Sequence, residues 1–157
     1  MANVDYFLRI DGIHGGSADT KHKDEIDIQS FSWGEQAALP SGGGGGAGKV
    51  TFQDFHFAAR TNKASPKLLV ACASGQHFKS ARLTGRASQK VSVDFLTVSF
   101  TDVLIASYDV GASSNEEPID QFSINFATIS MQYKEQRPDG TFETVDGGWD
   151  VKSNKQI

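Results

Sequence analysis

Apolar and polar side chains alternate along most of this chain, which is the pattern of β-strands with one buried face. The first such run spans residues 4–10, where Val4, Tyr6, Leu8 and Ile10 alternate with polar or less buried positions. Similar runs cover residues 26–34, 50–57, 80–87, 91–107, 122–133 and 142–151. The intervening residues 108–120 are polar and partly acidic, which is typical of a loop. The pattern therefore predicts a mainly β protein.

One segment, residues 61–76, has a helical pattern instead. Ser65 and Pro66 suit the cap and first turn of a helix, and Gly75 suits its C-terminal end. The expected apolar stripe consists of Leu68, Leu69, Ala71 and Cys72. We therefore expect a single helix packed on the β structure.

The alternation changes parity inside four of the predicted strands. The changes fall between Ile28 and Phe31, Phe52 and Phe55, Phe95 and Leu96, and Phe126 and Ile129. Successive residues of a strand point to opposite faces, so a parity change moves the buried set to the other face. Either a β-bulge bends the strand around a barrel corner, or one half of the strand packs on the core and the other half on a second subunit. Both explanations favour a tightly curved barrel.

Length and composition indicate one globular domain over residues 1–157, with 38% apolar residues and 11 phenylalanines. The net charge is −4 and the Lys and Arg residues are scattered, so binding to nucleic acid is not expected. No segment approaches the ~20 consecutive apolar residues of a membrane span, so insertion into a membrane is not expected either. The lone cysteine, Cys72, suits folding in a reducing cytoplasm. The N-terminal residues lack the features of a signal peptide, so any export would carry the folded domain.

A glycine-rich run, Gly42–Gly48, lies before Lys49 and resembles a phosphate-binding loop. Such a loop must open a helix and needs a hydroxyl at the position that Val50 occupies. A strand pattern follows instead, so an NTP-binding enzyme is not favoured. The run, which consists of Gly42, Gly43, Gly44, Gly45, Gly46, Ala47 and Gly48, is predicted to be a mobile loop.

No other group of residues points clearly to chemistry. The four histidines show no metal-ligand spacing, and Cys72 on the helix stripe is expected to be buried rather than nucleophilic. Three carboxylates, Asp24, Glu25 and Asp27, are interpreted as a solvated face rather than an acid–base site. The side chains of Trp33 and Trp149 could line a sugar site, but a place in the core is expected. We expect no cofactor and no metal, and the lack of a chemical motif favours a structural or interaction role.

Several motifs in a fixed order resemble the haemolysin-coregulated proteins (Hcp), the tube subunits of type VI secretion systems. They comprise Asp5-Tyr6-Phe7-Leu8, Ile10-Asp11-Gly12, Lys21-His22-Lys23-Asp24-Glu25-Ile26-Asp27, Ser32-Trp33-Gly34, the glycine run to Val50, Gln53-Asp54-Phe55, the helix from Ser65 to Gly75, Ile124-Asn125-Phe126-Ala127, Tyr133 and Gly148-Trp149-Asp150. No single motif is decisive, but their order and spacing together are specific.

The resemblance implies a two-sheet antiparallel β-barrel with one α-helix on its side. It also implies a homohexamer whose rings stack into a tube, which a contractile sheath drives out of the cell behind the spike protein VgrG. The resemblance further implies that small effector proteins could be carried and stabilised in the lumen, and that the protein is not an enzyme. The subunit would be cytoplasmic before assembly and extracellular afterwards.

Two sets of residues are assigned to this assembly. If Phe31 and Trp33 point into the barrel, Ser30 and Ser32 point the other way, and we expect them to face the lumen. The loop Gly42–Gly48 is expected to order on a neighbouring subunit or ring. The alternative is a monomeric β-barrel that binds a small molecule or carbohydrate.

Overall fold

A computed structural model describes residues 3–37, 50–88 and 92–157 of the protein. These residues form one helix, α1 (Ser65–Ser74), and a set of antiparallel strands. The strands are β1 (Asn3–Ile10), β2 (Ile26–Ile28), β3 (Ser30–Ser32), β4 (Glu35–Gln36), β5 (Thr51–Phe52), β6 (Phe55–Arg60), β7 (His77–Ser88), β8 (Val93–Gly111), β9 (Ile119–Asn125), β10 (Thr128–Gln136), β11 (Phe142–Asp150) and β12 (Lys155–Gln156).

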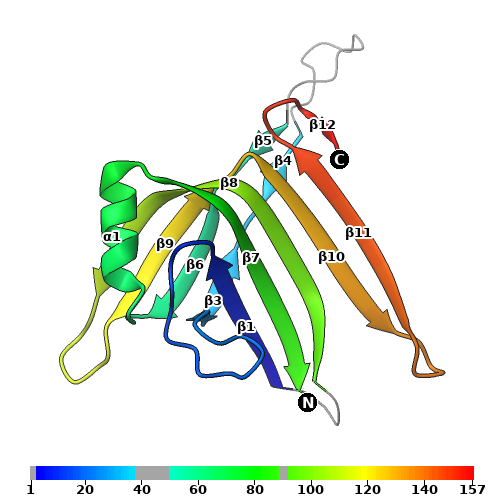
Figure 1. The fold of residues 1–157 in the computed structure, drawn as a ribbon, viewed down its shortest axis with the longest axis horizontal. Coiled ribbons are helices and arrows are strands. Elements are labelled where there is room, and N and C mark those ends of the chain that lie inside the picture. Colours follow the sequence, from blue (N-terminus) through cyan, green and yellow to red (C-terminus); the bar gives the residue numbers. More distant parts are fainter. Residues whose placement is uncertain (1–2, 38–49, 89–91) are drawn as a thin grey trace.

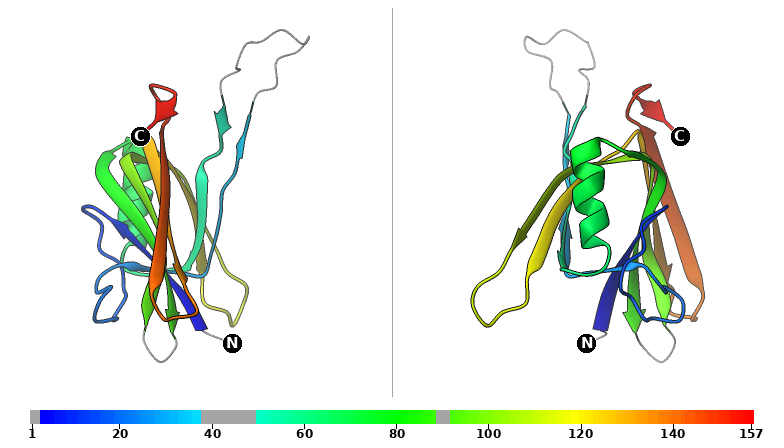
Figure 2. Two further views of the ribbon diagram at one scale, coloured as in Figure 1. Left: turned by 90° about the vertical axis from the view of Figure 1, so that its right-hand side faces the viewer. Right: turned by 60° about the vertical axis from the view of Figure 1, so that its left-hand side comes forward.

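The strands build two layers that share the long strand β8 (Figure 1). The first layer has the order β12-β11-β10-β8-β7-β1-β2, and the second contains β3, β6 and β9. The first half of β8 pairs with β10, whereas its second half, from Leu104 to Gly111, pairs with β9. In Figure 2 the cyan and blue-green strands of the second layer stand apart from the red β11. This confirms the predicted two-sheet, antiparallel β fold with one helix at its side.

A single residue, Gln29, turns the chain from one layer to the other. Strand β2 before it pairs with β1, and strand β3 after it pairs with β6. The Gln29 amide also donates to the Ala58 carbonyl of β6, at 2.8 Å. The hydrogen-bonded ladder itself does not close within the described residues, because β2 and β3 are separate strands that the chain alone joins.

The predicted parity changes mark the places where strands change layers or bulge. The change between Ile28 and Phe31 coincides with the corner at Gln29, and another coincides with the break between β9 and β10. A third separates β5 from β6. Within β8, Gly85 of β7 faces Leu96 while Arg86 faces Asp94, so Phe95 is an extra residue. This β-bulge confirms the first of the two expected causes.

Aromatic rings fill the space between the layers. The Phe55 ring lies 5.0 Å from that of Phe57 and 5.1 Å from that of Phe100, and Phe57 stacks on Phe122 at 5.3 Å. All four side chains are almost fully buried. Large side chains from both layers thus hold them together, as burial of apolar surface requires.

The helix is shorter than the sequence pattern suggests. It begins after Ala64, which makes no side-chain cap, so the expected cap role of Ser65 is wrong. The Ser65 hydroxyl instead donates to the carboxylate of Asp120. At the other end, Gly75 adopts a left-handed φ of 68° and its amide donates to the Ala71 carbonyl, as predicted.

The apolar stripe of the helix is narrower than expected. Leu68 and Ala71 are buried, and Cys72 is half-buried, but Leu69 is 54% exposed. The expected loop at residues 108–120 is also shorter, because β8 continues to Gly111. Strand β8 extends this far because residues Ser107 to Gly111 pair in register with residues 119–123 of β9.

Candidate assembly interface

Strands β10 and β11 lie at one end of the first layer (Figure 1). They carry large apolar side chains that stay exposed. On the face that includes the buried Ile129, the next residues of β10 are Met131 and Tyr133, which are 44% and 46% exposed. Val145 lies directly opposite Tyr133 in β11 and is 60% exposed. We call Met131, Tyr133 and Val145 the apolar face. Adjacent apolar side chains on one exposed sheet face are typical of a surface that meets another protein.

The apolar face borders a groove of about 420 Å³ between the β4–β5 hairpin and strands β10 and β11. It is lined by Trp33, Glu35, Val50, Phe52, Ile129, Met131, Gly147, Gly148 and Trp149. The Trp33 indole donates to the Gln53 carbonyl at 2.8 Å. The buried Trp149 Nε1 has no hydrogen-bond partner among the described residues. Both predicted tryptophans therefore lie at this groove, half-buried against the core.

The two predicted lumen residues lie on the side of β3 away from the core. Ser30 and Ser32 are exposed, whereas Phe31 between them is half-buried, with its ring 5.0 Å from Tyr6 and 5.7 Å from Phe55. The expected alternation is thus confirmed. Whether Ser30 and Ser32 face a lumen depends on the assembly and stays a prediction.

The predicted stacking loop, Gly42–Gly48, lies outside the described residues. The strands that lead to it are β4 and β5, which pair through Glu35 with Phe52 and Gln36 with Thr51. The predicted strand ends at residue 34, so strand pairing continues two residues further than expected.

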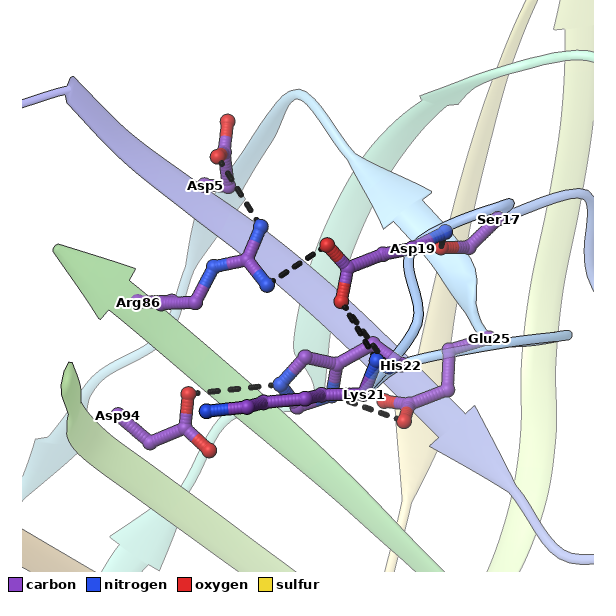
Figure 3. A network of polar contacts seen from close by, with 8 residues as sticks. All are labelled: Asp5, Ser17, Asp19, Lys21, His22, Glu25, Arg86 and Asp94. Atoms are coloured by element: carbon purple, nitrogen blue, oxygen red, sulfur yellow. Dashed lines mark hydrogen bonds and ion pairs between the residues drawn. The ribbon is translucent and has the colours of Figure 1, made fainter. Parts of the chain in front are cut away.

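A network of polar contacts fixes the segment between β1 and β2 to the first layer (Figure 3). We call it the polar clasp, and it consists of Asp5, Asp19, His22, Glu25, Arg86 and Asp94. Arg86 of β7 pairs with Asp19 at 2.7 Å and with Asp5 at 3.6 Å. The Asp19 carboxylate also accepts from the backbone amides of Lys21 and His22, at 3.1 Å each.

The imidazole of His22 is the buried centre of the polar clasp. Its Nδ1 lies 2.9 Å from Glu25 and its Nε2 lies 3.4 Å from Asp94 of β8. The ring stacks on Phe7 with centroids 4.4 Å apart, and the Arg86 guanidinium lies 4.9 Å from the same Phe7 ring. Stacking and ion pairing together hold the segment over the outer side of β1.

The ion pair with Arg86 changes the pKa of Asp19 in the polar clasp. The hydrogen bond from Arg86 lowers the pKa of Asp19 below its ordinary value, and the amide of Lys21 adds to this effect. A carboxylate that is stabilised in its charged form contributes to folding stability at neutral pH.

The three carboxylates Asp24, Glu25 and Asp27 have separate surroundings. Asp24 pairs with Lys63 at 3.4 Å and Glu25 pairs with His22. Asp27 makes no ion pair among the described residues. In the same residues, no three His, Cys, Asp or Glu side chains come close enough together to hold a metal ion. The clasp pair His22–Asp94 joins residues far apart in the sequence, which explains why the sequence pattern did not reveal it.

No helix in the described part of the chain has the length and hydrophobicity to cross a lipid bilayer.

Comparison with known proteins places this architecture in one family. The family model described as the type VI secretion system effector Hcp matches residues 7–133. The chain belongs to the Hcp family. It is 37% identical to the Hcp1 protein of Pseudomonas aeruginosa over 159 residues, which covers 98% of both chains.

Solved structures of type VI secretion proteins share the fold of this Hcp chain. Hcp1 from Salmonella typhimurium matches with a TM-score of 0.83 and 33% identity over the whole of both chains. A type VI secretion effector from Yersinia pestis matches with a TM-score of 0.76 and 31% identity, and covers 94% of this chain and 100% of its own. The chain is therefore a structural protein of type VI secretion, as the sequence motifs predicted.

Proposed function

We propose that this Hcp chain, as one domain over residues 1–157, assembles into homohexameric rings that stack into the type VI secretion tube. The apolar face is the observation that carries the proposal. Its three side chains expose large apolar areas, whereas most large apolar side chains in the described residues are buried or half-buried. Burial of such surface against a second copy is favourable, by about 25 cal/mol per Å² of apolar area.

The position of the apolar face favours a ring over a two-fold dimer. A ring needs two unlike surfaces on opposite sides of each subunit, and the contact then repeats until it closes. The apolar face lies on β10 and β11, at one end of the first layer. The other end of that layer is formed by β1 and β2, whose outward side chains are mostly polar. The two ends are therefore unlike surfaces.

Within the ring, Ser30 and Ser32 would face a polar lumen in which effector proteins are held during export. A test is Ser32→Trp, with Gln36→Trp on β4 as a matched control at another exposed position. We expect both variants to form rings and only Ser32→Trp to lose the stabilisation of a co-expressed effector. A misfolded Ser32→Trp variant, or unchanged effector stabilisation, would contradict the lumen assignment.

The loop Gly42–Gly48 would make the axial contact between rings, and ordering of its glycines would keep that contact weak. Deletion of residues 42–46 should leave the mass of the ring unchanged and reduce tube formation and secretion. Loss of the folded subunit after this deletion would show that the glycines serve the barrel instead.

The partners of the tube would be the contractile sheath and the spike protein VgrG, and the subunit would pass from the cytoplasm to the exterior with no catalytic step.

The rival function is a monomeric barrel that holds a small molecule or carbohydrate in the groove beside Trp33 and Trp149. Mass by light scattering, together with negative-stain images, separates the two. Ring-shaped hexamers support the tube subunit, whereas a monomer at all concentrations refutes it.

A further inference from the structure

Two pairs of like charges face each other across neighbouring strands. Arg9 of β1 lies directly opposite Arg82 of β7, and Glu135 of β10 lies directly opposite Glu143 of β11. All four side chains are exposed. None of them forms an ion pair within the described residues. Like charges directly opposite each other destabilise a sheet, so each pair is unfavourable in an isolated subunit.

The surroundings of the arginine pair increase its positive charge. Arg9 and Arg82 line a hollow of about 520 Å³ together with Lys21 and Lys23. Three carboxylates also line it, Asp11, Asp24 and Glu25. Two of them already have cationic or imidazole partners, because Asp24 pairs with Lys63 and Glu25 with His22. Four cations therefore stand against a single remaining carboxylate, in a chain whose net charge is −4.

The glutamate pair continues the apolar face. Side chains two residues apart on a strand share a face, so Glu135 follows Tyr133 and Glu143 precedes Val145 on the same side of the sheet. An apolar centre with a charged edge is the usual arrangement of a protein–protein interface. The glutamates are thus placed to contact whatever covers the apolar face.

The two charge pairs lie on opposite faces of the first layer. Arg9 alternates with the buried Leu8 and Ile10, so its side chain points away from the core. Arg82 likewise lies between the buried Ala81 and Leu83. The glutamates share the face of Ile129, which points toward the core. A head-to-tail contact between identical chains needs this kind of unlike, complementary pair of surfaces.

We propose that Glu135 and Glu143 of one copy bind Arg9 and Arg82 of the next copy around the ring. The inference rests on the proposed ring and names the charges that fix its direction and register. Opposite charges from the neighbouring copy would relieve both repulsions at once, and two carboxylates can satisfy two guanidinium groups through paired hydrogen bonds. Complementary charges of this kind set the register of an interface and exclude wrong partners.

Two double variants test the pairing. The acid-reversed variant is Glu135→Arg/Glu143→Arg, and the base-reversed variant is Arg9→Glu/Arg82→Glu. Each keeps a like-charge pair in the monomer, so the fold should tolerate the change. In a ring of either variant alone, every interface would join two pairs of the same sign. We expect ring formation to weaken at least about a hundredfold, because like charges at an interface cost several kcal/mol.

A one-to-one mixture of the two variants should restore rings with alternating subunits, since every interface then joins opposite charges again. Mass photometry or light scattering measures assembly, and distinct tags on the two variants identify mixed rings. Thermal unfolding of each variant checks that the monomer is folded. As controls, Arg60→Glu/Lys67→Glu and Glu116→Arg/Glu117→Arg make the same net changes at other exposed positions and should leave assembly unchanged.

The outcomes separate the two proposals. Failure of the wild-type chain to form rings refutes the proposed function. Wild-type rings together with normal rings of either double variant refute the pairing alone. The pairing is equally refuted if both variants lose their rings and the mixture does not restore them, because the arginines would then bind another acidic partner.

Discussion

Replacement of Asp120 by alanine would remove the common acceptor of three hydroxyl groups at the start of α1. The Asp120 carboxylate is fully buried in β9. Thr61 and Tyr108 donate to one of its oxygens, at 2.8 and 2.9 Å, and Ser65 donates to the other. These bonds join the beginning of the helix to both β8 and β9.

The size of the effect follows from the exposure of each donor. Ser65 is buried and would lose its acceptor with no access to water, at a cost of about 1–3 kcal/mol. Tyr108 is half-buried and should lose about 1 kcal/mol, whereas the exposed Thr61 can bind water instead. We therefore expect Asp120→Ala to lower the free energy of unfolding by about 2–4 kcal/mol. Asp120→Asn keeps one carbonyl acceptor and should cost about 1 kcal/mol.

Urea denaturation followed by tryptophan fluorescence measures these differences, at a concentration where the protein is monomeric so that assembly adds no stability. Tyr108→Phe is the partner variant and should cost about 1 kcal/mol. Burial raises the pKa of Tyr108 and the hydrogen bond to Asp120 adds to this. Because the folded pKa is raised, this contribution to stability is present below about pH 10 and is lost as the pH rises further.

Two results would refute this reasoning. The first is a loss below about 1 kcal/mol for Asp120→Ala, which would mean that the hydroxyls find other acceptors. The second is an equal alkaline loss of stability in the wild type and in Tyr108→Phe, because the variant lacks the titrating group.

Three further predictions concern other parts of the fold. In Gly85→Ala, the added Cβ would lie 2.9 Å from the ring of Tyr6 and 3.2 Å from that of Phe95, so urea denaturation should show a loss of about 1–3 kcal/mol. The difference in free energy of unfolding between the wild type and Asp19→Asn should be present above about pH 4 and should shrink below it, because the pKa of Asp19 is lowered in the folded state. A difference that does not change with pH would contradict this. At the exposed Val145, Val145→Asp should change monomer stability by less than about 0.5 kcal/mol and abolish rings by light scattering, and normal rings would exclude the apolar face from the interface.

The parity of apolar residues predicted much of the fold because each strand must bury one face. The corner at Gln29 and the bulge at Phe95 both appear in the sequence as interruptions of that parity. The pattern could not tell which strands pair, because alternation describes one strand at a time. It therefore did not show that β8 serves both layers or that β4 pairs with β5.

The candidate interface was less predictable than the fold. The exposure of Ser30 and Ser32 follows from alternation alone, and the sequence predicted it. Arg9 lies opposite Arg82 because of the register between β1 and β7, which local periodicity does not determine. The bond between His22 and Asp94 likewise depends on how a loop folds back over the sheet.

Strand β8 has 19 residues and is hydrogen-bonded to β7, β10 and β9 in turn. Because part of this one strand completes each layer, unfolding of the whole of β8 would break pairs in both layers. Slow amide hydrogen exchange should therefore be concentrated near the middle of β8, around Val98 to Ile105, and should report global unfolding. The subunit would then resist unfolding under load, which the proposed export of the tube by a contractile sheath requires.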